Sequence, residues 1–273
     1  MLKARILTAI VVLPLFLAAL FFLQDIFWVI VLLSLTVIGS REWSRLAGLS
    51  VKNTIVFMLL TTLVGGELLF QMSESLKTNV YSTELIWIYI VSVVFWIIAV
   101  PPYLKQLFTI KQPLILMLIG WIVLLPTCLA LYQLRAIGPM LLLGLMATIW
   151  ISDTAAYFTG KSLGKHKLAP QISPNKTWEG VAGALIAVLI YGLIWFWFIE
   201  QSLAAQLIPL LLFMAILGIV GDLYESLMKR QAGVKDSGNI LPGHGGILDR
   251  IDALTSSLPF AMLALLIFYS PAS

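Results

Sequence analysis

Charged side chains are scarce in this sequence. Asp, Glu, Lys and Arg make up 11% of the 273 residues, whereas 60% of the residues are hydrophobic. A soluble fold of this composition would have too few polar residues to cover its surface. The composition therefore predicts an integral membrane protein, and it disfavours a soluble enzyme.

Cysteine and histidine are almost absent as well. The single cysteine, Cys128, rules out an intrachain disulfide and lies in an apolar run, where packing is its expected role. The only histidines are His166 and His244, so partners for a nucleophilic triad are few. Nucleophilic catalysis by a cysteine or a serine–histidine pair is therefore disfavoured.

Nine apolar segments are candidates for crossing a membrane, because a bilayer core of ~30 Å asks for roughly 20 mostly apolar residues per helix. Little more than Gln24 and Asp25 separates the first two, which form either a tight hairpin or one interrupted element. The first follows Lys3 and Arg5 and is interpreted as an uncleaved helix, since more spans follow it. We therefore predict an all-α, polytopic protein. The nine segments are approximately 6–23, 26–40, 54–70, 85–100, 113–134, 139–158, 180–199, 205–221 and 251–269.

The cations sort strongly between alternate loops. Lys and Arg are retained on the cytoplasmic side during insertion. If the N-terminus is cytoplasmic, fifteen of the 17 cations fall inside, and only Lys77 and Arg135 fall outside. This sorting accounts for the net charge of +4 without a nucleic-acid partner. The fifteen are Lys3, Arg5, Arg41, Arg45, Lys52, Lys105, Lys111, Lys161, Lys165, Lys167, Lys176, Lys229, Arg230, Lys235 and Arg250.

The polar residues of interest gather in the C-terminal half. We divide the chain into N-terminal helices (1–80), middle helices (81–138) and a C-terminal catalytic membrane domain (139–273). Two inner loops of the last part, about 159–179 and 222–250, are longer and more charged than a hairpin requires.

Aspartates occur at or near the ends of the spans that precede these two loops, at Asp153 and Asp222. An ionisable residue at membrane depth is costly and indicates a cavity or a partner, although a residue at the boundary can simply be wetted by headgroup water. Glu225, Asp236, Asp249 and Asp252 lie in or just beyond the second loop. Mg²⁺ prefers oxygen ligands. If this loop folds back, Asp222 and Asp249 could share a metal.

Cations and glycines interleave with these acids. The cations of the second loop indicate a polyanionic ligand, whereas Lys161, Lys165 and Lys167 are more simply topology markers or contacts for anionic lipids. In "PGHGG" (242–246), proline and glycine favour turns, and backbone amides could meet phosphate. His244 would donate to a phosphate or have a structural role.

A second polar segment, "KLAPQISPNKTWEG" (167–180), precedes a predicted helix. Helix starts attract anions, so Ser173, Asn175 and Lys176 are candidate substrate-binding residues. The alternative is an ordinary capping segment with Ser173 or Thr177 as the cap.

A long pattern from Ser226 to Asp252 resembles the hallmark of phosphatidate cytidylyltransferases, also called CDP-diacylglycerol synthases. "SDTAAY" and "SPNKTWEG" are also similar to that family, so the resemblance covers roughly residues 150–270. The residues that match are Ser226, Leu227, Met228, Lys229, Arg230, Lys235, Asp236, Gly238, Leu241, Pro242, His244, Gly245, Gly246, Asp249, Arg250 and Asp252.

The resemblance implies a homodimeric enzyme of the inner (cytoplasmic) membrane that joins CTP to phosphatidic acid at its cytosolic face. It implies Mg²⁺ held by Asp222 and Asp249, with K⁺ as a candidate second ion. Asp236 and Asp252 would hold the Lys and Arg side chains that contact phosphate, or a second ion. Asp153, Lys176, Ser173, Asn175, His244, Gly245 and Gly246 would complete the substrate pocket. The phosphates would be contacted by Ser226, Lys229, Arg230, Lys235 and Arg250.

Two other functions fit part of the sequence. A CTP-dependent lipid kinase of the dolichol-kinase type would transfer the γ-phosphoryl group to a lipid alcohol and release CDP. An ion-coupled transporter would also keep acids in the membrane, but the repeated halves common in transporters are not visible here.

Overall fold

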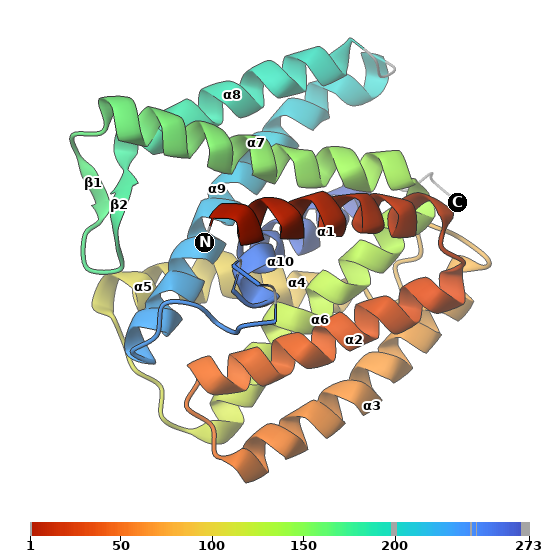
Figure 1. Ribbon diagram of the computed structural model, residues 1–273. Coiled ribbons are helices and arrows are strands. Elements are labelled where there is room, and N and C mark those ends of the chain that lie inside the picture. The colour runs from red at the N-terminus through yellow and green to blue at the C-terminus, as the bar shows by residue number, and fades with distance from the viewer. Residues whose placement is uncertain (1, 198–200, 241, 244, 269–273) are drawn as a thin grey trace.

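The computed structural model describes residues 2–197, 201–240, 242–243 and 245–268, with side chains described from residue 10 onward except at 201–206. These residues are almost entirely helical, with one small β-hairpin (Figure 1). The elements are α1 (Leu2–Phe22), α2 (Asp25–Leu46), α3 (Val51–Leu76), α4 (Ile86–Val94), the π-helical turn η1 (Phe95–Ala99), α5 (Val100–Gln106), α6 (Pro113–Ile137), α7 (Pro139–Leu163), β1 (Lys167–Ala169), β2 (Ser173–Thr177), α8 (Trp178–Phe196), α9 (Gln201–Gln231) and α10 (Leu248–Phe268).

Each of the nine predicted spans corresponds to a helix or a composite helix, in the predicted order. Eight helical segments of the described chain are long and apolar enough to cross a membrane, and the ninth is the shorter apolar part of α1, Ile10–Phe22. α1 and α2 are separate helices, as the hairpin alternative predicted. The fourth span is composite, because Pro101 and Pro102 lack the N–H groups that would continue a regular ladder from α4. The π-turn η1 absorbs this interruption.

Successive helices run in opposite directions, so alternate connections lie at the same end of the bundle. The connections 47–50 and 107–112, the β-hairpin and the segment 232–247 lie at the left end in Figure 1. Lys77 follows α3, and Arg135 lies in the last turn of α6, and both of these helices end at the opposite end of the bundle. The helix arrangement therefore agrees with the alternate sorting of the cations.

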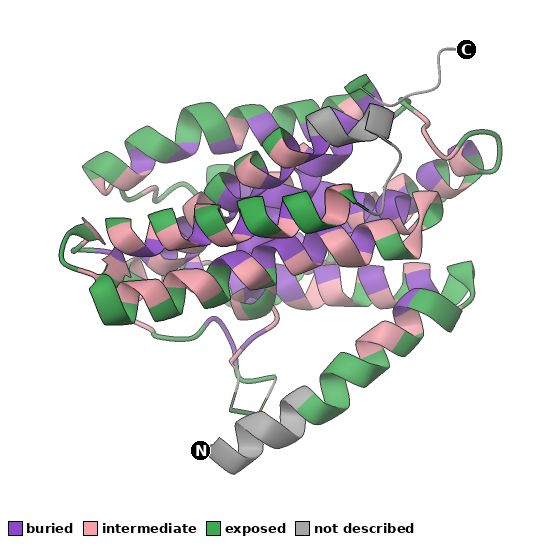
Figure 2. Cartoon of the chain, turned by 90° about the horizontal axis from the view of Figure 1, so that it is seen from above, coloured by how far each residue is buried: buried purple, intermediate pink, exposed green. Residues whose placement is uncertain are grey.

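The N-terminal helix lies at the edge of the bundle. Figure 2 shows α1 leaning away from the other helices, and Ile10 and Leu15 are both exposed. Near its end, Leu20 is fully buried, and Arg135 of α6 donates to the Leu20 carbonyl at 2.9 Å and to the Asp25 carboxylate at 2.9 Å. An arginine thus satisfies a free carbonyl at the C-terminal end of α1.

The buried core contains residues from every part of the chain. One apolar cluster extends from Leu20 to Leu266 and includes residues of all three predicted parts of the chain. The division at residues 80 and 138 stays a prediction about sequence segments, and the packing crosses both positions.

The two polar inner loops are shorter than predicted. α7 continues to Leu163, and α9 continues to Gln231, because the sequence holds no glycine or proline between Gly221 and Gly233. The residues from 167 to 177 form the antiparallel hairpin β1–β2, in which Lys167 pairs with Thr177. The first part of the predicted 222–250 loop is therefore helical, with its charged side chains in fixed relation.

The helix arrangement predicts which exposed residues share a side of the membrane. In variants that each carry one added cysteine, a membrane-impermeant maleimide should label Lys52→Cys and Lys165→Cys from one side and Lys77→Cys from the other. The unchanged protein is the control, because Cys128 is only 4% exposed and should not react. Labelling of all three variants from the same side would contradict this arrangement.

Candidate active site

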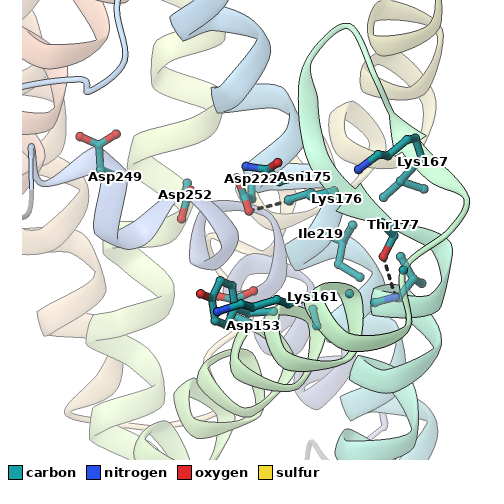
Figure 3. Close-up of a pocket in the computed structure, with 17 residues that line it drawn as sticks. Asp153, Lys161, Lys167, Asn175, Lys176, Thr177, Ile219, Asp222, Asp249 and Asp252 are labelled. Carbon is teal, nitrogen blue, oxygen red and sulfur yellow. Dashed lines mark hydrogen bonds and ion pairs between the residues drawn. The ribbon is translucent and has the colours of Figure 1, made fainter.

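A pocket of about 740 Å³ lies at the end of the bundle that carries the β-hairpin (Figure 3). Residues of α7, α8, α9 and α10 and of the hairpin line it. Its lining residues are Asp153, Ala156, Tyr157, Gly160, Lys161, Gly164, Lys167, Leu168, Asn175, Lys176, Thr177, Gly180, Val181, Ile219, Asp222, Asp249 and Asp252.

One wall of the pocket is set by very close packing of α9 on α10. A Cβ at Gly221 would lie 2.5 Å from the Ser256 hydroxyl and 2.7 Å from the Asp252 carbonyl. The Ser256 hydroxyl also donates to the Leu217 carbonyl at 2.7 Å. Small residues allow such an approach of two membrane helices. Asp222, next to Gly221, is thereby brought close to Asp252.

The opposite wall is set in the same way by α7 and α8. A Cβ at Gly180 would lie 2.9 Å from the Ala156 carbonyl, so only glycine fits there without a shift. The Thr177 hydroxyl accepts from the Gly180 amide at 3.1 Å and caps α8. The capping interpretation of Thr177 is therefore confirmed, and Thr177 also lines the pocket.

Asp222 is paired with a cation across the pocket. The Lys176 ammonium lies 2.5 Å from its Oδ2, and the Ser226 hydroxyl donates to its Oδ1 at 3.3 Å. The two side chains of the ion pair remain 25% and 29% exposed. This pair connects the β-hairpin with α9, so two predicted site residues from distant segments meet here.

Asp249 is more fully engaged. Its Oδ2 accepts from the amides of Ser237 and Gly246 at 2.9 and 2.8 Å, and from the Ser237 hydroxyl at 2.9 Å. Its Oδ1 accepts from Lys229 at 2.9 Å, and Lys229 also lies 3.2 Å from Glu225. Figure 3 shows the Asp249 carboxylate directed away from Asp222. Both aspartates line the same pocket, but they face different partners.

The glycine-rich segment is organised around carboxylates. Gly245 has a φ of +86°, where a side chain would be strained. The Gly246 amide, predicted to face phosphate, donates instead to Asp249. His244, predicted to bind substrate, lies outside the described residues.

Apart from Asn175, the remaining predicted residues that the structure describes lie around the pocket rather than in it. Arg230 donates through Nε to the Ile172 carbonyl at 3.3 Å and supports the hairpin. Ser173 lies in β2, paired with Ala169. Lys235 and Asp236 are exposed in the 232–247 segment, and Arg250 is exposed in the first turn of α10. Asn175 lines the pocket as predicted.

Three pocket residues were assigned other roles or missed by sequence reasoning. Lys161 and Lys167, interpreted as topology markers, line the pocket, and so does Tyr157, whose ring lies 5.7 Å from the Lys161 ammonium. The spacing of Asp153, Tyr157 and Lys161 by four residues places them on one face of a helix, and this signal was available in the sequence.

The pocket fits a divalent cation in its donor chemistry. Four carboxylates reach it, from Asp153, Asp222, Asp249 and Asp252. Among the described residues, no three acidic, cysteine or histidine side chains converge closely enough to enclose a metal by themselves. Mg²⁺ does not need such a cage, because it commonly takes one or two carboxylates and completes its shell with substrate phosphates and water.

Comparison with known proteins gives one consistent family. A family model described as the cytidylyltransferase family matches residues 3–268. The chain is 34% identical over 283 residues to a phosphatidate cytidylyltransferase of Haemophilus influenzae, covering 95% of this chain and 97% of the relative. It is 38% identical over 268 residues to that of Pseudomonas aeruginosa, covering 96% and 97%. A Bacillus subtilis phosphatidate cytidylyltransferase is 51% identical over 127 residues, 44% of this chain and 45% of the relative.

The tight packing around Gly246 predicts that a larger residue at this position lowers the stability of the protein. A Cβ there would lie 2.3 Å from the Ser237 hydroxyl and 2.5 Å from the Glu42 carboxylate. Overpacking of this kind costs about 1–3 kcal/mol, so Gly246→Ala should lower the unfolding temperature in detergent. Gly66→Ala is the matched control, since its Cβ would meet only Leu33 at 3.9 Å. Equal stability of the two variants would contradict the packing described here.

Proposed function

Since the chain belongs to the cytidylyltransferase family, we propose that its pocket is the place where CTP meets phosphatidic acid. The protein is a multi-pass membrane enzyme of phospholipid biosynthesis that transfers the cytidylyl group of CTP to phosphatidic acid, forming CDP-diacylglycerol and pyrophosphate. One observation supports the pocket as its active site: four aspartates and three lysines line a single cavity between membrane helices.

The charge of the pocket supports a metal cofactor. With all of them ionised, the four aspartates exceed the three lysines, Lys161, Lys167 and Lys176, by one negative charge. CTP is itself a polyanion, so its triphosphate would be repelled unless a cation neutralises the carboxylates. We propose Mg²⁺ in this role, held by Asp222 and Asp249, with Asp153 and Asp252 beside it and K⁺ as a second ion.

The reaction needs no strong general base. A phosphate oxygen of phosphatidic acid, already anionic at neutral pH, attacks the α-phosphorus of CTP. The new P–O bond forms as the bond to the bridging oxygen of the β-phosphate breaks, and pyrophosphate leaves with the electron pair. Cancellation of charge and in-line positioning are what the protein must supply. A bound metal adds Lewis-acid stabilisation of the phosphoryl oxygens.

The lysines that are paired in the structure supply part of that cancellation. Lys176 is held by Asp222, and Lys229 by Asp249 and Glu225. When cations and substrate share these carboxylates, Lys176 and Lys229 are placed to contact phosphate oxygens. Ser226, Arg230, Lys235 and Arg250 are proposed as further phosphate contacts from the same end of the bundle.

The surroundings of the pocket suit a lipid substrate. Its walls are membrane-spanning helices, and Val181 and Ile219 line it beside the charged groups. A phosphate headgroup can therefore enter while its acyl chains stay in the bilayer. From the cation sorting we propose an inner-membrane location with the pocket facing the cytosol, and from the family resemblance alone we propose a homodimer.

The decisive assay is incubation of purified protein in detergent with CTP, phosphatidic acid and Mg²⁺. We expect pyrophosphate and a nucleotide-linked lipid in equal amounts, and their loss when the metal is chelated. Release of CDP with a phosphorylated lipid alcohol would indicate the lipid kinase instead. Absence of any product from a folded preparation would contradict the proposed function.

Asp222 should be essential for turnover. Asp222→Asn removes one charge from the proposed metal site but keeps the shape of the side chain, so kcat should fall by ~100-fold or more, in line with several kcal/mol of charge stabilisation by a metal. Glu74→Gln is the control, because Glu74 is exposed at the other end of the bundle and pairs only locally with Lys77. An Asp222→Asn enzyme with unchanged kcat at ordinary Mg²⁺ would remove Asp222 from the site.

A further inference from the structure

A buried carboxylate outside the pocket comes from the N-terminal part of the chain. Glu42, near the end of α2, is only 4% exposed. The ion pairs found among the described side chains do not include it. A buried carboxylate is costly unless hydrogen bonds satisfy it. Its donors therefore show what this residue is for.

Among the described residues, the donors to Glu42 belong to the segment that carries the predicted site motif. The Ile247 amide donates to Oε1 at 3.0 Å, and the Leu248 amide donates to Oε2 at 2.8 Å. These are backbone groups at the start of α10, where a helix leaves N–H groups without partners and favours negative charge. Glu42 thus caps α10 from a helix about 200 residues earlier in the chain.

The motif glycines leave room for this carboxylate. A Cβ at Gly238 would lie 2.3 Å from Glu42 Oε1, and one at Gly246 would lie 2.5 Å from the same atom. The backbone is therefore packed directly against the carboxylate at two positions. Glycine is required here for close approach to Glu42, independently of any contact with substrate.

Ser237 connects Glu42 to the pocket. Its hydroxyl lies 3.3 Å from Glu42 Oε2 and 2.9 Å from Asp249 Oδ2. The Ser237 amide and the Gly246 amide also donate to that Asp249 oxygen. Two carboxylates, one from α2 and one from α10, thus hold the segment 237–248 between them, and Asp249 presents its other oxygen to Lys229.

The inner end of α2 is itself held firmly. The Trp43 indole donates to the Leu116 carbonyl of α6 at 2.8 Å. A Cβ at Gly120 would lie 2.7 Å from the Trp43 ring, so α2 and α6 are in close contact beside Glu42. A residue fixed by such neighbours can hold a loop in one place.

We propose that Glu42 is a positioning residue for the cytidylyl-transfer site: it holds the segment 237–248 so that Asp249 and Lys229 face the pocket in their working arrangement. This inference rests on the proposed function. Glu42 is not among the described residues that line the pocket, and it acts through Ser237 and the amides of Ile247 and Leu248. Groups that orient the residues of a metal site typically affect metal affinity or activity by roughly 10–100-fold.

The test uses Glu42→Gln and Ser237→Ala in the full chain. In Glu42→Gln, one carboxylate oxygen is replaced by an NH₂ group, which can only donate. At least one of the hydrogen bonds that backbone amides donate to Glu42 is therefore lost. We expect the Mg²⁺ concentration for half-maximal activity, and the KM for CTP, to rise about 10-fold or more. Deuterium exchange should become faster in peptides covering 237–248 and stay unchanged in α3. Glu84→Gln, at an exposed site in the outer connection, is the matched control.

Each outcome decides the proposal. Glu42→Gln with a lower unfolding temperature but unchanged Mg²⁺ midpoint, KM and exchange in 237–248 would show a merely structural role and overturn it. If Glu42→Gln does not fold, Ser237→Ala carries the same test, because it cuts the connection between the two carboxylates and leaves Glu42 in place. If the unchanged protein makes no CDP-diacylglycerol, the proposed function fails, whereas the exchange experiment still shows whether Glu42 holds the segment.

Discussion

The close packing of α9 on α10 at Gly221 is the contact on which the site depends. Because a side chain at Gly221 would collide with Ser256 and with the Asp252 carbonyl, the two backbones approach as closely as glycine allows. The adjacent Asp222 is carried to the same pocket as Asp252 and Asp249. Gly180 has the equivalent role between α7 and α8, so rigid helices rather than loops position both walls of the pocket.

The carboxylates concentrated there would be costly at the edge of a membrane without opposite charges. In the structure, lysines meet this need, because Lys176 pairs with Asp222 and Lys229 pairs with Asp249. The same arrangement suits a reaction between two anions. We propose that these lysines and carboxylates, which neutralise one another in the structure, exchange partners when a metal ion and phosphates enter.

The glycine-rich segment gains a different meaning from its contacts. Read alone, "PGHGG" resembles a backbone surface for phosphate, yet the Gly246 amide donates to Asp249 and the next two amides donate to Glu42. The N-terminal half of the chain, which carries no part of the motif, therefore takes part in the site through one buried glutamate. The glycines of the motif thus pack against a residue of an N-terminal helix, and this contact connects the two parts of the chain.

The sequence by itself determined the membrane class, the nine apolar segments, their alternate direction and the family, because hydrophobic length, cation sorting and a dense motif are all local signals. It also identified Asp153, Lys176, Asp222 and Asp249, which now share one pocket. Only the tertiary structure decided that α9 continues into the motif as far as Gln231, that Lys161 and Lys167 reach the pocket, and that Glu42 caps α10. These depend on contacts between side chains and backbone far apart in the chain, and helix packing sets such contacts without leaving a local pattern.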